Sequence, residues 1–221
     1  MSLILYYHPL ASFCWKPLIA LYENQTSFTP KLVDLGDENS RDAFFKIWPI
    51  GEFPVLEDSQ KDSKTNKIIP QSASIIEYLN LHYSGSSKMI PADLELAFET
   101  RHWDGFYDDY LHAPMQAIVG DCIRPADKRD PMGTDEFHQT IRTSYDILEK
   151  RMTGRTWAVG DTFTMADCSA APALFYADKV EPLGNKYPSL SSYLARLKQR
   201  PSFARVLEEA KPYFHMFPYK K

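Results

Sequence analysis

A serine and a cysteine lie two residues apart in the stretch HPLASFCWKPLIAL, residues 8–21, and both residue types can take part in thiol chemistry. A thiol with a pKa near 8.5 is only ~3% thiolate at pH 7, and the thiolate is the nucleophile. Lowering that pKa by two units requires about 2.7 kcal/mol of preferential stabilisation of the anion. A hydroxyl that donates to the sulfur, together with helix N–H groups, can supply this. Ser12 is therefore a candidate for stabilising a thiolate, and an ordinary N-cap is the alternative interpretation.

The turn that carries Ser12 must lie between a strand and a helix. Residues 3–7, LILYY, are short and apolar and are followed by a proline turn, which predicts a strand. Pro17 lacks an N–H group, and proline is tolerated in the first turn of a helix but not in its interior. We therefore expect regular helix to begin between residues 14 and 16, with an irregular turn at 10–13.

Strand and helix patterns alternate through the first 84 residues. The further predicted elements are strands at 27–35, 53–57 and 67–69, and helices at 39–47 and from residue 72 onward. Residues 58–66, DSQKDSKTN, predict a polar hairpin loop between the last two strands. The order β-α-β-α-β-β-α implies α/β layer packing with some parallel strand pairing.

The pattern changes at HYSGSSKMIPADLE, whose Ser, Gly and Pro residues predict a linker at 85–92. The remainder shows helical patterns and no convincing strand. These helices are expected at 94–119, at 135–152, after Thr164, and within SLSSYLARLKQR and SFARVLEEAK. Thr164 as N-cap with Asp167 at the third helical position predicts a capping box, and Pro172 is expected to kink that helix. The chain is thus predicted to have an α/β domain at 1–84 and an all-helical domain at 93–221.

Composition excludes several classes of protein. Hydrophobic residues make up 44% of the chain and charged residues 24%, as in soluble folded proteins, and a net charge of −4 gives no basis for a nucleic-acid partner. No apolar run approaches the roughly 18 residues of a membrane helix. The N-terminus lacks a basic segment and is broken by Pro9 and Pro17, so we expect no secretory signal. Cys14, Cys122 and Cys168 are odd in number and far apart, which predicts reduced thiols and a cytoplasmic location. Since no His or Cys spacing is typical of zinc, no metal is expected.

Four stretches resemble, in the expected order, segments of the cytosolic glutathione S-transferase family, and together they span nearly the whole chain. YYHPLASFCWKPLIAL resembles the first strand, active-site turn and first helix of bacterial members of the serine/cysteine type. PIGEFPVLED resembles the strand entered through a cis-proline, and PQSASIIEYL the segment that holds the glutamyl end of glutathione. TFTMADCSAAPAL resembles the capped helix of the C-terminal domain. The resemblance implies a thioredoxin-like, glutathione-binding domain followed by a helical bundle.

The resemblance also assigns residues to glutathione. It implies a cis peptide bond before Pro54, which exposes the backbone of Phe53 to the cysteinyl part; an ordinary edge-strand proline is the alternative. Gln71 and Ser72 are implied to hold the glutamyl end, where N–H groups at a helix start suit a carboxylate. Ser72 can cap its own helix as well.

The sequence departs from the family at the glycyl end of glutathione. Several relatives have a lysine that contacts the glycyl carboxylate where this chain has Glu52. A glutamate repels a carboxylate, so either Arg41 or Lys46 replaces the lysine or this end is held loosely.

The thiol-activating position also departs from the pattern. The catalytic hydroxyl of several serine-type classes, and the nucleophilic cysteine of glutaredoxin-like relatives, align with Ala11. Ser12 aligns with the second serine of a Ser-Ser-Cys turn, and Tyr7 with the hydroxyl of tyrosine-type classes. Cys14 aligns with the resolving cysteine of a redox pair whose first member is missing, which favours a packing or site-lining thiol. We rank the candidates Ser12, Tyr7 and then Cys14.

Aromatic residues recur at three- and four-residue spacings in the first predicted helix of the C-terminal domain. They are Trp103, Phe106, Tyr107 and Tyr110. The resemblance places a second substrate against this helix, between the domains. We therefore expect them to line an electrophile pocket, although such a stripe is more often part of a core.

These features lead to one main functional hypothesis and two alternatives. The main hypothesis is a glutathione transferase that activates the glutathione thiol for attack on a hydrophobic electrophile, as in detoxification. The alternatives are a glutathione-dependent isomerase or peroxidase, and a non-catalytic binding or interaction module, with which Ala11 is consistent. A thioltransferase is disfavoured because position 11 is not cysteine. The resemblance further implies a homodimer.

Overall fold

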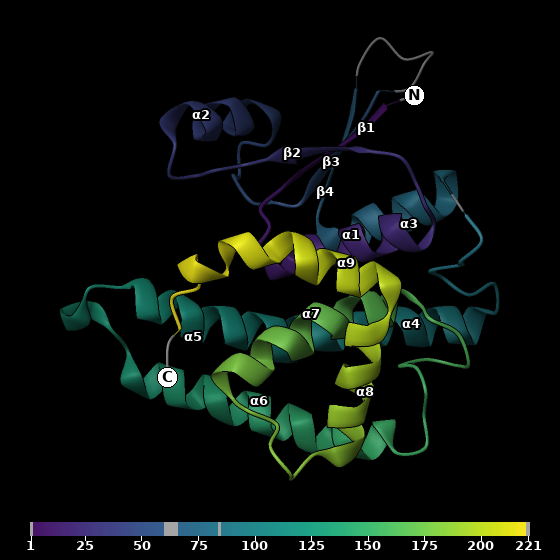
Figure 1. Cartoon of the computed structure of the whole chain (residues 1–221), viewed down its shortest axis with the longest axis vertical. Helices are drawn as coiled ribbons and strands as arrows, with labels where there is room; N and C mark the ends of the chain where they lie inside the picture. Colours follow the sequence, from purple (N-terminus) through teal and green to yellow (C-terminus); the bar gives the residue numbers. More distant parts are fainter. Residues whose placement is uncertain (1, 60–65, 84, 220–221) are drawn as a thin grey trace.

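The computed structural model describes residues 2–59, 66–83 and 85–219. A small sheet with its own helices forms one layer, and a bundle of helices forms another beneath it (Figure 1). This arrangement confirms the predicted thioredoxin-like α/β domain followed by a helical domain. Six residues of the predicted hairpin loop, 60–65, lie outside the described residues.

Within the described residues, four strands form one mixed sheet in the order β2-β1-β3-β4. Their bounds are β1 (Ser2–Tyr7), β2 (Thr29–Leu32), β3 (Val55–Ser59) and β4 (Lys67–Pro70). β1 pairs in parallel with β2 and antiparallel with β3, and β4 pairs antiparallel with β3. β2 is shorter than the strand predicted at 27–35, because it is an edge strand and Pro30 cannot donate to the ladder.

Helices cover both faces of the sheet. In Figure 1, α2 (Glu38–Ile47) lies on one side and α1 (Ser12–Glu23) and α3 (Ser72–His82) on the other. The alternation of side chains along β1 explains this. Leu3 and Leu5 enter the main core, whereas the Tyr6 ring lies 5.9 Å from that of Phe44 on α2. The sheet is thus buried on two sides, and its site-bearing loops emerge at its ends.

The first helix begins earlier than predicted. The turn expected at 10–13 is already helical from Ser12, and it closes through the Cys14 N–H, which donates to the Ala11 carbonyl at 2.9 Å. Pro17 is therefore inside the helix, where it removes one hydrogen bond. Trp15 on this helix is fully buried, and burial of such a side chain offsets the loss of one bond.

The C-terminal layer contains most of the helices. Their bounds are α4 (Leu94–Tyr107), a π-helical turn (Asp108–His112), α5 (Ala113–Ile123), α6 (Pro131–Met152), α7 (Met165–Val180), α8 (Pro188–Gln199) and α9 (Pro201–Ala210). Two short 3-10 turns follow α5 and α9. The helix predicted at 135–152 begins at Pro131, because Asp130 caps it by accepting from the Gly133 N–H at 3.0 Å.

The single helix predicted at 94–119 is interrupted by the π-helical turn. Pro114 has no N–H group to donate to the Tyr110 carbonyl, so the regular hydrogen-bond pattern cannot continue there. The Ser144 hydroxyl on α6 lies 3.1 Å from that carbonyl and can donate in its place. Such π turns occur often at functional sites, and this one lies beside the N-terminal domain.

α1 joins the two layers by packing on α7 and α9. The Trp15 ring contacts those of Tyr176 on α7 and Phe203 on α9. At the end of α1, Glu23 accepts two hydrogen bonds from Arg200, at 2.7 and 2.6 Å. The helix that follows the candidate turn is therefore held by both domains.

Candidate active site

Two pockets are lined by neighbouring residues at the turn between β1 and α1. The first, which we call the β3–α3 pocket, has a volume of about 400 Å³. It is formed by the loop before β3, the start of α3, the π-helical turn and one residue of α1: Trp48, Ile50, Glu52, Phe53, Pro54, Pro70, Gln71, Ser72, Ala73, Asp108, Asp109 and Phe13. Its mixture of backbone, hydroxyl and carboxylate groups suits a polar ligand.

The second pocket, which we call the α1–α5 pocket, has a volume of about 370 Å³. It is formed by the turn, by α5, and by residues of α7 and the C-terminal segment: Leu10, Ala11, Ser12, Met115, Gln116, Val119, Gly120, Ile123, Tyr176, Phe217 and Pro218. Most of these side chains are apolar, so this pocket suits a hydrophobic ligand.

Ser12 lies next to both pockets along the chain. Ser12 lines the α1–α5 pocket, and the next residue, Phe13, lines the β3–α3 pocket. Ser12 is 3% exposed, and its Oγ accepts from Nε2 of Gln116 on α5 at 3.4 Å. Because Gln116 donates, the hydroxyl hydrogen of Ser12 stays available to a ligand. The first backbone N–H groups of α1 lie before the regular hydrogen-bond pattern of the helix begins, so they need no partner within it.

The backbone of this turn is fixed by hydrogen bonds. The Tyr176 hydroxyl donates to the Leu10 carbonyl at 2.9 Å, and the Trp15 indole donates to the Pro9 carbonyl at 2.6 Å. The Ala11 N–H donates to the His8 carbonyl at 3.0 Å. Ser12 is thus held in place by both domains before any ligand arrives.

The β3–α3 pocket contains the four residues that the sequence assigned to the cysteinyl and glutamyl ends of a ligand. The Phe53–Pro54 peptide bond is cis. Ser72 is buried at the first position of α3, and Gln71 before it has a φ of 68°, a value that residues other than glycine rarely adopt. Backbone held in such a conformation is concentrated at functional sites. The free N–H groups at the start of α3 make this end suited to a carboxylate.

Tyr7 and Cys14 are not brought to either pocket. Cys14 is fully buried, and burial raises the pKa of its thiol far above the usual range. Burial, followed by the nearby Glu209 charge, raises the pKa of Tyr7. Cys14 therefore stays a thiol at neutral pH, whereas Tyr7 keeps a hydroxyl that could donate but lines neither pocket. Of the three candidates, only Ser12 lines one of the two pockets.

The family is decided by comparison with known proteins. Residues 5–87 match the model of the glutathione S-transferase N-terminal domain, and residues 131–196 match that of the C-terminal domain. The chain belongs to the glutathione S-transferase family. A glutathione S-transferase-like protein of Fusarium is 28% identical over 144 residues, 63% of this chain, and elongation factor 1-gamma-B of Xenopus laevis is 24% identical over 215 residues, 94% of this chain. The chain spans only 61% and 47% of the length of these two relatives.

A solved structure shows the same fold. The glutathione S-transferase of Methylobacillus flagellatus, crystallised with glutathione bound, is 23% identical and superposes with a TM-score of 0.82. The comparison covers 93% of this chain and 98% of that one. At 23% identity, the similarity between the two structures establishes a shared fold. The site of this transferase-family chain is defined by its own residues.

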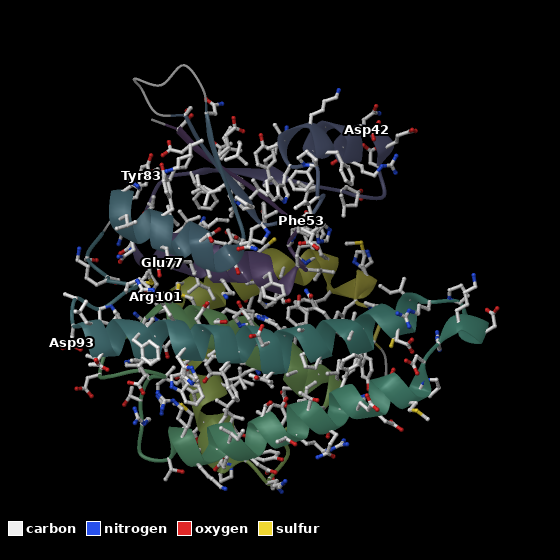
Figure 2. All side chains as sticks on the ribbon, turned by 180° about the vertical axis from the view of Figure 1, so that it is seen from behind. Asp42, Phe53, Glu77, Tyr83, Asp93 and Arg101 are labelled. Atoms are coloured by element: carbon white, nitrogen blue, oxygen red, sulfur yellow. The ribbon has the colours of Figure 1, made fainter. Side chains whose placement is uncertain are left out.

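The cations that the sequence offered for the glycyl end of glutathione are not in the β3–α3 pocket. Arg41 lies on α2 with its guanidinium 3.8 Å from Glu38 and 3.6 Å from Asp42, and Figure 2 shows Asp42 on the part of α2 away from Phe53. Lys46 is exposed on the same helix. The carboxylates of Glu52, Asp108 and Asp109 line the pocket instead.

A buried ion cluster between the domains fixes one of these carboxylates. Lys16 of α1 is fully buried, with Nζ 2.9 Å from Oδ1 of Asp104 and 2.5 Å from Oδ2 of Asp108. Nδ1 of His112 lies 3.1 Å from the other Asp108 oxygen. Burial raises the pKa of Asp108, but the hydrogen bond from His112 and the Lys16 charge outweigh it and hold the pKa below its usual range. Asp108 is therefore ionised where it lines the pocket, while its two oxygens already contact Lys16 and His112.

The predicted electrophile-pocket residues lie elsewhere. Trp103, Phe106 and Tyr110 line a groove between α4 and α6, and Tyr107 is fully buried. None of them lines the α1–α5 pocket. Recurrence at three and four residues identifies a helix face but not the neighbour that the face contacts, and here that neighbour is α6.

The described part of the chain shows neither a metal site nor a membrane span. Among the described residues, no cluster of three His, Cys, Asp or Glu side chains is arranged to hold a metal ion. In the same part of the chain, no helix combines the length and apolar character needed to cross a membrane.

Proposed function

We propose that this chain is a glutathione transferase, in which the β3–α3 pocket binds glutathione and the α1–α5 pocket binds a hydrophobic electrophile. The observation that carries the proposal is the place of Ser12 on a turn fixed by hydrogen bonds: it lines the apolar pocket and directly precedes Phe13, which lines the polar one. A thiol held in the first pocket beside Ser12 faces an electrophile held in the second.

The charges of the β3–α3 pocket suit the glutamyl end of glutathione. The α-carboxylate is expected at the start of α3, where the Ser72 hydroxyl and free N–H groups can donate to it. The α-ammonium group is expected beside Asp108 and Asp109, which also line this pocket. The peptide then extends along the Phe53 backbone, which brings its thiol toward Ser12.

The proposed reaction needs only stabilisation of the thiolate and proximity. The thiol proton passes to solvent water, and the Ser12 hydroxyl donates to the sulfur anion that remains. The sulfur lone pair then forms a bond to the electrophilic carbon, and either a leaving group departs with its electron pair or the adduct takes a proton from water. Gln116 acts as a positioning residue, because its Nε2 donates to Ser12 Oγ and leaves the serine proton directed elsewhere.

The second-substrate pocket that we propose differs from the one expected from sequence. We assign it to Met115, Val119, Ile123, Tyr176 and Phe217 rather than to the aromatic residues of α4, because the former surround Ser12. Their apolar character favours a hydrophobic electrophile.

We also infer a homodimer in the cytoplasm. Leu81, Leu94 and Phe98 are 72%, 84% and 67% exposed. Burial of these side chains against a second copy would remove apolar surface from water. The described cysteines are free, which suits a reducing compartment.

The central test replaces the serine. In Ser12→Ala, we expect the pKa of bound glutathione, read from thiolate absorbance against pH, to rise by roughly one to two units, because a hydrogen bond to an anion contributes about 1.5–3 kcal/mol. Catalytic efficiency with a chromogenic electrophile should fall roughly 10- to 100-fold. Gln116→Leu should cause a smaller rise, since it changes only the direction of the hydroxyl. Ser192→Ala, an exposed position on α8, is the matched control.

A non-catalytic module is the second candidate, because Ala11 occupies the position where the resemblance places a catalytic hydroxyl. Glutathione that binds with an unshifted thiol pKa in wild type would favour this candidate over the transferase. A shifted thiol with turnover only of a cis-trans isomerisation substrate or a hydroperoxide would assign the isomerase or peroxidase activity instead.

A further inference from the structure

One end of the β3–α3 pocket carries a negative charge, and no cation forms part of the described pocket wall. Glu52 lines this end together with Trp48 and Ile50. Among the described residues that form the pocket wall, none is lysine, arginine or histidine. The ionisable groups of the wall are Glu52, Asp108 and Asp109, and all three are acids.

These acids lie at two different ends of the pocket. Asp108 and Asp109 follow α4, which runs beside α3: the ion pair between Arg101 and Glu77 joins the two helices, and Figure 2 shows the two side chains facing each other. A neighbouring groove contains Gln71 together with residues of α4, whereas the loop before β3 does not line that groove. Glu52 therefore belongs to the end away from α3.

The two ends are suited to different chemical groups. The α3 end offers donors for a carboxylate and two acids for an ammonium group, which together match the α-amino acid end of a peptide. A ligand that binds in this direction places its other terminus near Glu52. Arg41 on α2 faces Glu38 and Asp42, and Lys16 is fully buried against Asp104 and Asp108. Neither cation is placed to neutralise a second carboxylate there, and Lys46, exposed on α2, does not line the pocket.

We propose that the preferred thiol of this site is a γ-glutamyl thiol peptide whose far terminus is uncharged, such as glutathione with its glycyl carboxylate capped as an ester or amide. The proposal rests on the proposed function, because it takes the direction of the bound peptide from that assignment. Glu52 is the specificity-determining residue: its carboxylate repels a free glycyl carboxylate and leaves an ester or amide unaffected.

The test compares two thiols that differ only in this charge. Glutathione and its glycyl monoethyl ester are titrated calorimetrically into wild type, Glu52→Gln and Glu52→Lys. We expect wild type to bind the ester about tenfold more tightly, which corresponds to about 1.4 kcal/mol. Glu52→Gln should bring the ratio near one, and Glu52→Lys should reverse it. The wild-type ratio should also shrink as salt rises, because ions screen exposed charges.

The control is Glu136→Lys, which makes the same charge change at an exposed position of α6 outside the pocket. It should keep the wild-type ratio, which separates a local effect of Glu52 from a change in net charge. Glu52 is itself exposed, so we expect its variants to unfold at the wild-type temperature.

Two outcomes overturn the proposal, and they differ in what they say about the proposed function. If wild type binds both thiols equally and Glu52→Lys leaves the ratio near one, the specificity proposal fails while glutathione binding stands. If neither thiol binds to wild type, the proposed function fails and the specificity proposal fails with it.

Discussion

Replacing Lys16 with methionine is expected to destabilise the fold by about 3–5 kcal/mol, the usual effect of removing one partner from a buried ion pair. Lys16 is fully buried between the carboxylates of Asp104 and Asp108, and Asp104 is nearly so. Without the ammonium group, two acids of the C-terminal domain, one helical turn apart, are left at the domain interface with no cation between them. The loss of charge compensation, rather than the change in side-chain volume, is the cause of the effect.

The destabilisation of Lys16→Met should depend on pH. Burial already raises the pKa of Asp104, and removal of the lysine would raise it further. It would also raise the pKa of Asp108, which Lys16 and His112 hold below its usual range in the wild type. An acid whose folded pKa exceeds its unfolded value near 4 contributes stability at low pH and loses it as pH rises through the folded pKa. The deficit of the variant is therefore expected to be larger at pH 7.5 than at pH 5.

Urea unfolding at pH 5 and 7.5 measures both effects. Lys150→Met, at an exposed position of α6, should change the free energy of unfolding by less than about 0.5 kcal/mol. The triple variant Lys16→Met, Asp104→Asn, Asp108→Asn should recover much of the loss, because it removes the uncompensated charges. A deficit that is equal at both pH values and persists in the triple variant would indicate lost packing rather than lost charge compensation.

The parts of this fold that depend on neighbouring residues in the chain could be predicted from sequence. The capping box is the clearest case: Thr164 and Asp167 are one helical turn apart, and the structure confirms that each side chain caps the other's backbone. Phe53–Pro54 and Gln71–Ser72 were likewise found as short motifs, although their convergence on one pocket depends on the sheet.

Residues whose role depends on a distant segment could not be predicted. Gln116 reaches Ser12 across 104 positions of sequence, and no local pattern marks it. Asp108 enters the β3–α3 pocket through a π-helical turn that combines Pro114 with a hydroxyl from α6. Pro114 was the visible signal of this interruption, but the partner that makes it possible, Ser144, lies on a different helix.

The aromatic residues of α4 show the same limit on one helix. Tyr107 is fully buried, whereas its neighbour Phe106 lines the groove toward α6. Phe106 and Tyr107 are both aromatic, and both fit the spacing of a helix face. Consecutive residues nevertheless point about 100° apart around a helix, so the two side chains meet different neighbours. Only the packing partners distinguish core from groove, and those partners are α6 and α7.

Asp167→Asn is expected to destabilise the fold by about 3 kcal/mol at pH 7, because the third residue of α7 loses one of its two acceptor oxygens. Oδ1 of Asp167 accepts from the Ala158 N–H at 2.9 Å and from the Tyr193 hydroxyl at 2.6 Å, and Oδ2 accepts from the Thr164 N–H at 2.9 Å. Both oxygens therefore face donors. An amide nitrogen at either position would place two donors together in a fully buried site.

Asp93 provides the matched control for this substitution. It is exposed at the start of α4, where Figure 2 labels it, and its Oδ1 accepts one hydrogen bond, from the Leu96 N–H at 2.9 Å. Asp93→Asn keeps an acceptor oxygen for that bond, so the free energy of unfolding should change by less than about 0.5 kcal/mol. Equal effects at the two positions would contradict the view that Asp167 acts through several buried donors at once.

The pH dependence gives a second test of Asp167. Burial raises its pKa to about 6, although hydrogen bonds from the Ala158 N–H, Tyr193 and Thr164 act in the opposite direction. Since the folded pKa exceeds the unfolded value near 4, the stability linked to this proton is complete below pH 4 and is lost as pH rises through 6. The amide that Asp167→Asn introduces cannot titrate, so urea unfolding should show a gap between wild type and this variant that is about 1 kcal/mol wider at pH 5 than at pH 7. A gap that does not change with pH would mean that Asp167 is ionised throughout this range and that its four donors outweigh the effect of burial.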